Sequence, residues 1–216
     1  MQLGRAQARI RLAILASLLH DDGFYGILGK AFFIISLVIC LSAVTKQCIP
    51  DYSVVKANGH TILCVGGAVS VDRQARIDAW EHNQRKVHRY SHNSADGELL
   101  APNYYWQDEA PIFNKEMLAE IISKHQIDTV VTHTAPSFCE LQNKDGLQQW
   151  AIYDDSLLDD VQRERETMDA IYANLRADTQ TLTHWYYGHF HQSWHSSIDG
   201  VLFKMLDIME LAELTP

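Results

Sequence analysis

The chain has 216 residues, a length that suffices for one substantial domain. Hydrophobic residues make up 47% of the sequence and charged residues 21%, which is typical of a globular protein and not of a disordered or fibrous one. The formal net charge of -9 argues against a general nucleic-acid-binding protein, because such proteins usually present a basic face.

The four cysteines are scattered along the chain, with no C-x-x-C pair and no compact spacing. They are Cys40, Cys48, Cys64 and Cys139. This distribution fits reduced thiols better than a disulfide framework. We therefore expect a cytoplasmic protein.

The N-terminal segment, residues 1–48, differs in character from residues 49–216, which we expect to form the main domain. Arginines at positions 5, 9 and 11 precede a leucine-rich stretch, and this pattern predicts a short amphipathic helix. Residues 31–44 form a run of fourteen without a charge. A membrane-spanning helix needs about 18–20 apolar residues, and a signal peptide would begin earlier. We expect a buried or atypical segment here, with a membrane anchor as the alternative.

A regular pattern begins near Ile49. Residues 53–57 and 60–65 flank Asn58-Gly59, and this dipeptide is typical of a two-residue type I′ turn, so the stretch predicts a β-hairpin. The second strand ends in Ile62-Leu63-Cys64-Val65, a continuous apolar run that indicates a strand covered on both faces.

Gly66-Gly67 ends this strand, and the loop that follows contains Asp72 and Arg73. We expect these two side chains to form a fixed ion pair that supports the loop, a structural role and not a direct chemical one. Residues 77–113 are polar and scattered with glycine and proline, which predicts an irregular, largely exposed excursion.

A helix–strand unit follows. Asn114 is a suitable N-cap for a helix that runs to about Lys124, and residues 127–132 form a short apolar strand. Sheets built from such units place ligands beyond the carboxyl ends of their strands. His133 therefore lies where a ligand of a bound metal would lie, although alone it equally suits a histidine that hydrogen-bonds a neighbouring loop.

A second helix is predicted over residues 155–177, with the charged run Arg163–Glu166 as its solvated face. Residues 182–187 form an aromatic, apolar strand that leads into Gly188-His189-Phe190-His191. After a turn, residues 201–208 read as another strand, which we expect to pair antiparallel with the strand before it.

His189 and His191 are separated by one residue in the stretch Gly188-His189-Phe190-His191. In an extended chain such a pair points to one face, and two neutral imidazoles are good ligands for a divalent metal. His133, His189 and His191 are therefore the candidate metal ligands, from the ends of two strands. The alternative is a surface loop that happens to be rich in histidine.

Taken together, the motifs resemble the calcineurin-like metallophosphoesterases. Gly66-Gly67-Ala68 with Asp72-Arg73, then the stretch 132–136 around His133, then Gly188-His189-Phe190-His191 occur in the order of that family, over about residue 50 to the end. The resemblance implies an α/β fold, a β-sandwich flanked by helices, that uses a two-metal site with manganese, iron or zinc to hydrolyse a phosphate ester.

Carried over by position, His133 and His189 match ligands of the second metal, and His191 matches a ligand of the first. The Asp72-Arg73 stretch matches a loop that supports the site without coordinating metal. The resemblance assigns no catalytic residue. His20 would occupy the place of the family's catalytic histidine.

The chain also departs from the family pattern. The motifs D-x-H and G-D-x-x-D do not occur before residue 50, and G-N-H-[DE] has at most the remnant Leu18-Leu19-His20-Asp21. Three histidines without a bridging carboxylate suit one transition-metal ion better than two. We therefore expect a sandwich that is incomplete at its N-terminus and a phosphoesterase of impaired activity.

The alternative is a non-catalytic, truncated or diverged remnant of the same fold that serves binding or oligomerisation. Loss of early strands would leave sheet edges and apolar surface to be covered. Residues 31–44 or a second copy of the chain, in a homodimer, would provide that cover.

Overall fold

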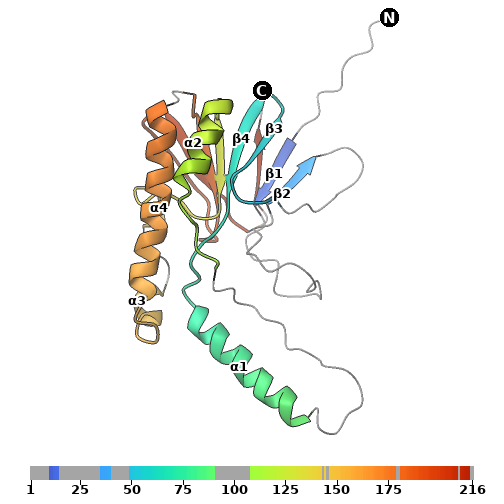
Figure 1. The fold of residues 1–216 in the computed structure, drawn as a ribbon, viewed down its shortest axis with the longest axis vertical. Coiled ribbons are helices and arrows are strands. Elements are labelled where there is room, and N and C mark those ends of the chain that lie inside the picture. The colour runs from blue at the N-terminus through green and yellow to red at the C-terminus, as the bar shows by residue number, and fades with distance from the viewer. Residues whose placement is uncertain are drawn as a thin grey trace, which may run out of the picture.

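The computed structural model of the chain describes residues 10–14, 35–39, 49–90, 108–142, 144, 146–178, 181–208 and 210–214. It contains helices and a mixed six-stranded sheet, so the general α/β class predicted from the sequence is confirmed. A second sheet of three strands lies against the large one, and helices α2 and α4 cover the opposite side (Figure 1).

The large sheet has the strand order β3-β4-β5-β6-β8-β7. Its strands are β3 (Ser53–Ala57), β4 (His60–Val65), β5 (Thr129–Thr132), β6 (His184–Tyr187), β7 (Trp194–Ile198) and β8 (Val201–Met205). The central strands β4, β5, β6 and β8 are parallel, whereas β3 and β7 run antiparallel at the two edges. The carboxyl ends of the parallel strands therefore meet at one edge of the sheet.

The predicted hairpin is confirmed. β3 and β4 pair antiparallel with Ala57 opposite His60. Both turn residues have positive φ, 52° at Asn58 and 88° at Gly59, as a type I′ turn requires. The Asn58 side chain donates a hydrogen bond of 2.7 Å to the carbonyl of Leu214 and so ties the hairpin to the last strand.

The predicted antiparallel pairing of residues 201–208 with the preceding apolar strand is wrong. β8 runs parallel to β6, with Trp185 opposite Phe203, and it ends at Met205. Its antiparallel partner is β7, joined to it by the turn at Asp199-Gly200. β7 has the sequence Trp-His-Ser-Ser-Ile and lies at the sheet edge, so it carries little of the apolar pattern that identifies a strand.

The small sheet has the order β2-β1-β9 and is antiparallel throughout. It consists of β1 (Ile10–Ile14), β2 (Ile35–Ile39) and β9 (Leu211–Leu214). The prediction of an amphipathic helix at the start of the chain is thus wrong for residues 10–14. These residues form a strand that pairs with β2 on one side and with β9 on the other. β2 lies within the uncharged run 31–44. No helix among the described residues is both long and apolar enough to cross a membrane.

Two of the predicted helices are confirmed. α2 (Lys115–Lys124) is capped by Asn114, whose side chain accepts a hydrogen bond of 2.9 Å from the backbone N–H of Met117. α4 (Leu157–Asp178) corresponds to the second predicted helix. A short helix, α3 (Leu147–Trp150), precedes it.

Residues 73–90 form the helix α1 (Arg73–Tyr90), so the irregular structure predicted from residue 77 is wrong for this stretch. α1 extends away from the sheets (Figure 1). A helix that buries little surface still forms where i,i+4 side-chain pairs support it. Here Arg76 pairs with Asp72, and Arg85 pairs with Glu81. The polar composition that indicated a loop is that of a solvated helix.

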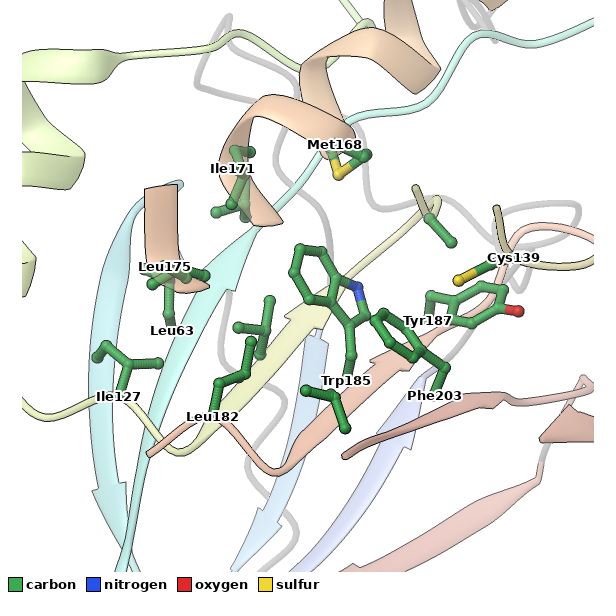
Figure 2. Close-up of a cluster of buried hydrophobic side chains, with 14 of the residues drawn as sticks. Leu63, Ile127, Cys139, Met168, Ile171, Leu175, Leu182, Trp185, Tyr187 and Phe203 are labelled. Atoms are coloured by element: carbon green, nitrogen blue, oxygen red, sulfur yellow. The ribbon is translucent and has the colours of Figure 1, made fainter. Parts of the chain in front are cut away.

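The main core lies between the large sheet and α4 (Figure 2). Trp185 and Phe203 stack from neighbouring strands with ring centroids 5.8 Å apart. The fully buried side chains around them include Leu63, Ile127, Leu118, Leu175, Met168 and Ile171. The opposite face of the same strands presents Ile62, Cys64, Val131 and Tyr186 to β9, where Ala212 and Leu214 are buried.

Candidate functional site

Three loops leave the carboxyl ends of adjacent parallel strands and together form the candidate site. They comprise residues 66–72 after β4, 133–136 after β5 and 188–191 after β6. The backbone N–H of Gly188 donates a hydrogen bond of 3.1 Å to the carbonyl of His133, so the second and third loops are in direct contact. The predicted site residues therefore lie at the sheet edge where ligands of such folds bind.

His133 and His189 face one another across this edge. The Nδ1 atom of His189 lies 3.0 Å from the Nε2 atom of His133, and the two ring centroids are 4.7 Å apart at an interplanar angle of 68°. Both side chains are half-buried. Two residues that are 56 positions apart in the sequence are thus brought to hydrogen-bonding distance by the parallel pairing of β5 and β6.

Both imidazoles are neutral at physiological pH. Burial is the main cause that holds the pKa of each well below its ordinary value of 6.5, and the positive charge of Lys144 acts in the same direction. His191 further lowers the pKa of both, so it is close enough to act on them electrostatically. A neutral imidazole has a lone pair available for a metal, which a protonated one has not.

The backbone of the third loop is strained. His189 has φ 72° and His191 has φ 53°, in the left-handed region that residues other than glycine seldom occupy. The extended conformation predicted for His189 and His191 is therefore wrong, because both residues have a left-handed backbone. Strain of this kind persists only where the surroundings enforce it, and it clusters at functional sites.

His191 is exposed, whereas the other two histidines form the close pair. Within the part of the chain that the structure describes, no group of three or more histidine, cysteine, aspartate or glutamate side chains is arranged to hold a metal ion. Two imidazole nitrogens suit a borderline divalent ion such as Zn or Fe, whereas Mn prefers oxygen ligands. The pair supplies part of a ligand set, and the predicted third ligand does not join it in this structure.

The solvated face predicted for Arg163–Glu166 is wrong at its two central residues. Glu164 is buried, and its carboxylate accepts hydrogen bonds from the backbone N–H of Val69 at 2.5 Å and from the hydroxyl of Thr134 at 2.6 Å. It also forms a buried ion pair with Lys144, at 2.8 Å. One carboxylate of α4 thus binds the loops after β4 and β5 and carries the cation that acts on the histidines.

Arg165 is the second buried member of the run. Its guanidinium donates hydrogen bonds to the carbonyls of Ala135 and Pro136, at 2.7 and 3.3 Å, and to that of Leu141. The Cζ atom of the same group lies 4.9 Å from the ring centroid of Phe190, the residue that separates His189 and His191 in the sequence. Burial lowers the pKa of this arginine.

A signal for these two residues is present in the sequence. Four consecutive residues span about 300° of a helix, so they cannot all face solvent when the helix is packed against a sheet. Glu164 and Arg165 follow Val161 by three and four positions and precede Met168 by four and three, which places them on the same stripe as these two buried residues.

The predicted ion pair between Asp72 and Arg73 is wrong in its partners. Arg73 is buried and binds two carboxylates of the segment before and within α4, Asp154 at 2.5 Å and Asp160 at 2.6 Å. Asp72 instead pairs with Arg76, one helical turn further along α1. The expected supporting role is retained, because Arg73 ties the loop after β4 to the start of α4. Its hydrogen bonds to Asp154 raise the pKa of the guanidinium.

Two further carboxylates hold the loop after β4. Glu109 accepts hydrogen bonds from the backbone N–H of Ser70 at 2.6 Å and from its hydroxyl at 2.9 Å. Asp51 accepts one of 2.7 Å from the backbone N–H of Gly66. Burial raises the pKa of both carboxyls. Both carboxylates lie far in the sequence from the residues that they bind, so no local sequence pattern identifies them.

Several sequence-derived expectations fall outside the described residues. His20, the candidate remnant of a catalytic histidine, lies there, as do Cys40 and Cys48. Cys64 and Cys139 are buried free thiols, and burial raises the pKa of each to about 12.

Comparison with known proteins assigns the chain to no family. No family model matches the sequence, and no curated protein is significantly similar to it.

Proposed function

We propose that the chain is a metal-dependent phosphoesterase of the calcineurin-like type, in which His133 and His189 bind a divalent ion. The observation that carries the proposal is the pair of neutral imidazoles whose nitrogens lie 3.0 Å apart at the ends of two parallel strands. When bound, such an ion supplies Lewis acidity toward a phosphoryl oxygen. The proposed substrate is a phosphate monoester or diester.

The arrangement of the layers supports a finer proposal for the fold, a metallophosphoesterase-like β-sandwich. The two sheets pack through a buried apolar cluster that includes Ile62, Tyr186 and Leu214. Helices α2 and α4 flank the large sheet on its other face (Figure 1). The loops that carry the histidines leave the large sheet at a single edge.

The surroundings of the pair disfavour protonation of both imidazoles. Burial is the main cause that lowers their pKa and the cation of Lys144 acts in the same direction, so each ring keeps one unprotonated nitrogen at neutral pH. His191 is the proposed ligand of a further ion, as the family resemblance implies. Its place in the same loop as His189 supports this assignment.

A second candidate function is a non-catalytic remnant of the same fold that acts in binding or oligomerisation. It is favoured by one observation: the described residues form no group of three metal ligands. The absence of D-x-H and G-D-x-x-D before residue 50 agrees with it. This alternative predicts a folded protein without metal and without turnover.

Elemental analysis and an activity assay distinguish the two candidates. The full chain is purified without chelators, its Mn, Fe and Zn are measured, and hydrolysis of p-nitrophenyl phosphate and bis-p-nitrophenyl phosphate is followed with added Mn²⁺. We expect stoichiometric bound metal and turnover that His189→Ala abolishes. If the unmodified chain holds no metal and shows no turnover, the proposed enzymatic function is refuted.

The matched control is His195→Ala. His195 lies on β7 and is exposed, so it shares the chemistry of the removed side chain without its position. Metal content and turnover should be unchanged in this variant. A loss equal to that of His189→Ala would mean that histidines bind metal or substrate without regard to position.

A further inference from the structure

We propose that Glu164 and Arg165 of α4 are positioning residues that fix the His133–His189 pair by binding all three loops of the site. This inference rests on the proposed function, because it names the residues that hold the proposed metal ligands in place. Both side chains act through the loops, because their hydrogen bonds and ring contact reach Val69, Thr134, Ala135 and Phe190.

Glu164 joins the first two loops. Its Oε2 atom accepts from the backbone N–H of Val69, in the loop after β4, and from the ammonium of Lys144 at 2.8 Å. Its Oε1 atom accepts a hydrogen bond of 2.6 Å from the hydroxyl of Thr134, the residue next to His133. Lys144 extends the link, since it also donates a hydrogen bond of 2.6 Å to the carbonyl of Val69. Movement of this carboxylate would shift both loops together.

Arg165 joins the second loop to the third. Its Nη1 group donates to the carbonyls of Ala135 and Pro136, two and three residues after His133, while its Cζ atom lies over the ring of Phe190. Phe190 in turn contacts His189 edge-on, with ring centroids 5.2 Å apart. The guanidinium thus supports the left-handed backbone of the loop that presents His189.

Stability alone does not explain why charged residues occupy positions 164 and 165 of α4. The same helical stripe is apolar on both sides, at Val161 and Met168. A buried ion pair seldom stabilises more than well-packed apolar residues would, because its charges lose their hydration. Glu164 and Arg165 instead form hydrogen bonds with polar groups of the site loops, and apolar side chains provide no such bonds. These groups are the backbone N–H of Val69, the hydroxyl of Thr134 and the carbonyls of Ala135 and Pro136.

The run itself supplies matched controls. Arg163 and Glu166 are exposed neighbours on the same helix. Glu164→Gln is therefore compared with Glu166→Gln, and Arg165→Lys with Arg163→Lys. Thr134→Val tests the same link without a change at a buried charge, since it removes only the hydroxyl that binds Glu164.

Two measurements on the full-length variants report on position. The ring nitrogens of His133 and His189 are observed by ¹⁵N NMR in histidine-labelled protein without metal, and Zn²⁺ affinity is measured by calorimetry. We expect shifted ring resonances and Zn²⁺ affinity reduced about 10–100-fold in Glu164→Gln, Arg165→Lys and Thr134→Val. Arg163→Lys and Glu166→Gln should match the unmodified protein.

Circular dichroism and thermal unfolding identify the variants that stay folded. Folded variants with unchanged ring resonances and unchanged Zn²⁺ affinity would overturn the positioning role. If the unmodified protein binds no Zn²⁺, the proposed function fails, and the metal-free ring resonances decide the positioning role separately. Thr134→Val provides this result even where loss of a buried charge prevents folding.

Discussion

Gly67, at the start of the first site loop, is expected to tolerate no side chain. Its φ is 92°, and a Cβ atom built on it would lie 2.5 Å from the nitrogen and 2.7 Å from the Cα of Pro111. Both atoms belong to the backbone of a segment that is held in place, because Glu109 binds the backbone N–H groups of Ala68 and Ser70. Neither chain segment can move away without breaking these bonds.

The cost of Gly67→Ala has two parts. A residue with a Cβ atom in the left-handed region costs about 1–2 kcal/mol. Overpacking a tight contact costs about 1–3 kcal/mol more, so the free energy of unfolding should fall by about 2–5 kcal/mol in total. Gly59→Ala is the matched control, because Gly59 has φ 88° and no atom within 4 Å of the added Cβ. It should lose only the first part, about 1–2 kcal/mol.

Urea unfolding followed by tryptophan fluorescence measures both variants against the unmodified chain. The m-values should agree, so that a change in midpoint reports a change in stability. The difference between the two variants isolates the contact with Pro111. A loss for Gly67→Ala no greater than that for Gly59→Ala would refute the close approach of the two segments.

Two further predictions concern the core and the loop anchor. Phe203→Ala removes a fully buried ring that stacks on Trp185 and should lower the free energy of unfolding by about 3–5 kcal/mol in the same urea assay; a loss under about 1 kcal/mol would contradict its central place in the core. The hydrogen bonds from Arg73 hold the pKa of Asp154 below its ordinary value of 3.8, so their stabilisation is complete above that value and is lost as the pH falls below it. Asp154→Asn should cost about 1–3 kcal/mol at neutral pH and progressively less as the pH falls below 3.8, and a cost that does not change with pH would contradict the ion pair.

Local rules determined several elements of this fold. Asn58-Gly59 specifies its turn because both positions need positive φ, whatever surrounds them. Asn114 specifies the start of α2 because its side chain binds a backbone N–H three residues on. The apolar runs identify β4, β5 and β6, and the carboxyl ends of these strands indicate where His133 and His189 lie.

Other features depend on contacts between distant residues. The direction in which β8 pairs is decided by the edge strand β7, whose sequence carries little of the apolar pattern that identifies a strand. The burial of Glu164 and Arg165 depends on the loops that α4 covers, because a charged side chain is retained in the interior only where partners meet it.

By itself, the sequence determined the hairpin, the two amphipathic helices, the apolar strands and the strand ends that carry the histidines, since each depends on residues near one another in the chain. Only the tertiary structure decided that His133 and His189 face one another at 3.0 Å while His191 stays exposed. Only it shows that a carboxylate and a guanidinium of α4 bind the loops that carry these histidines. The reason is physical: periodicity reports the face on which a side chain lies, whereas its partner is set by the packing of segments that are remote in sequence.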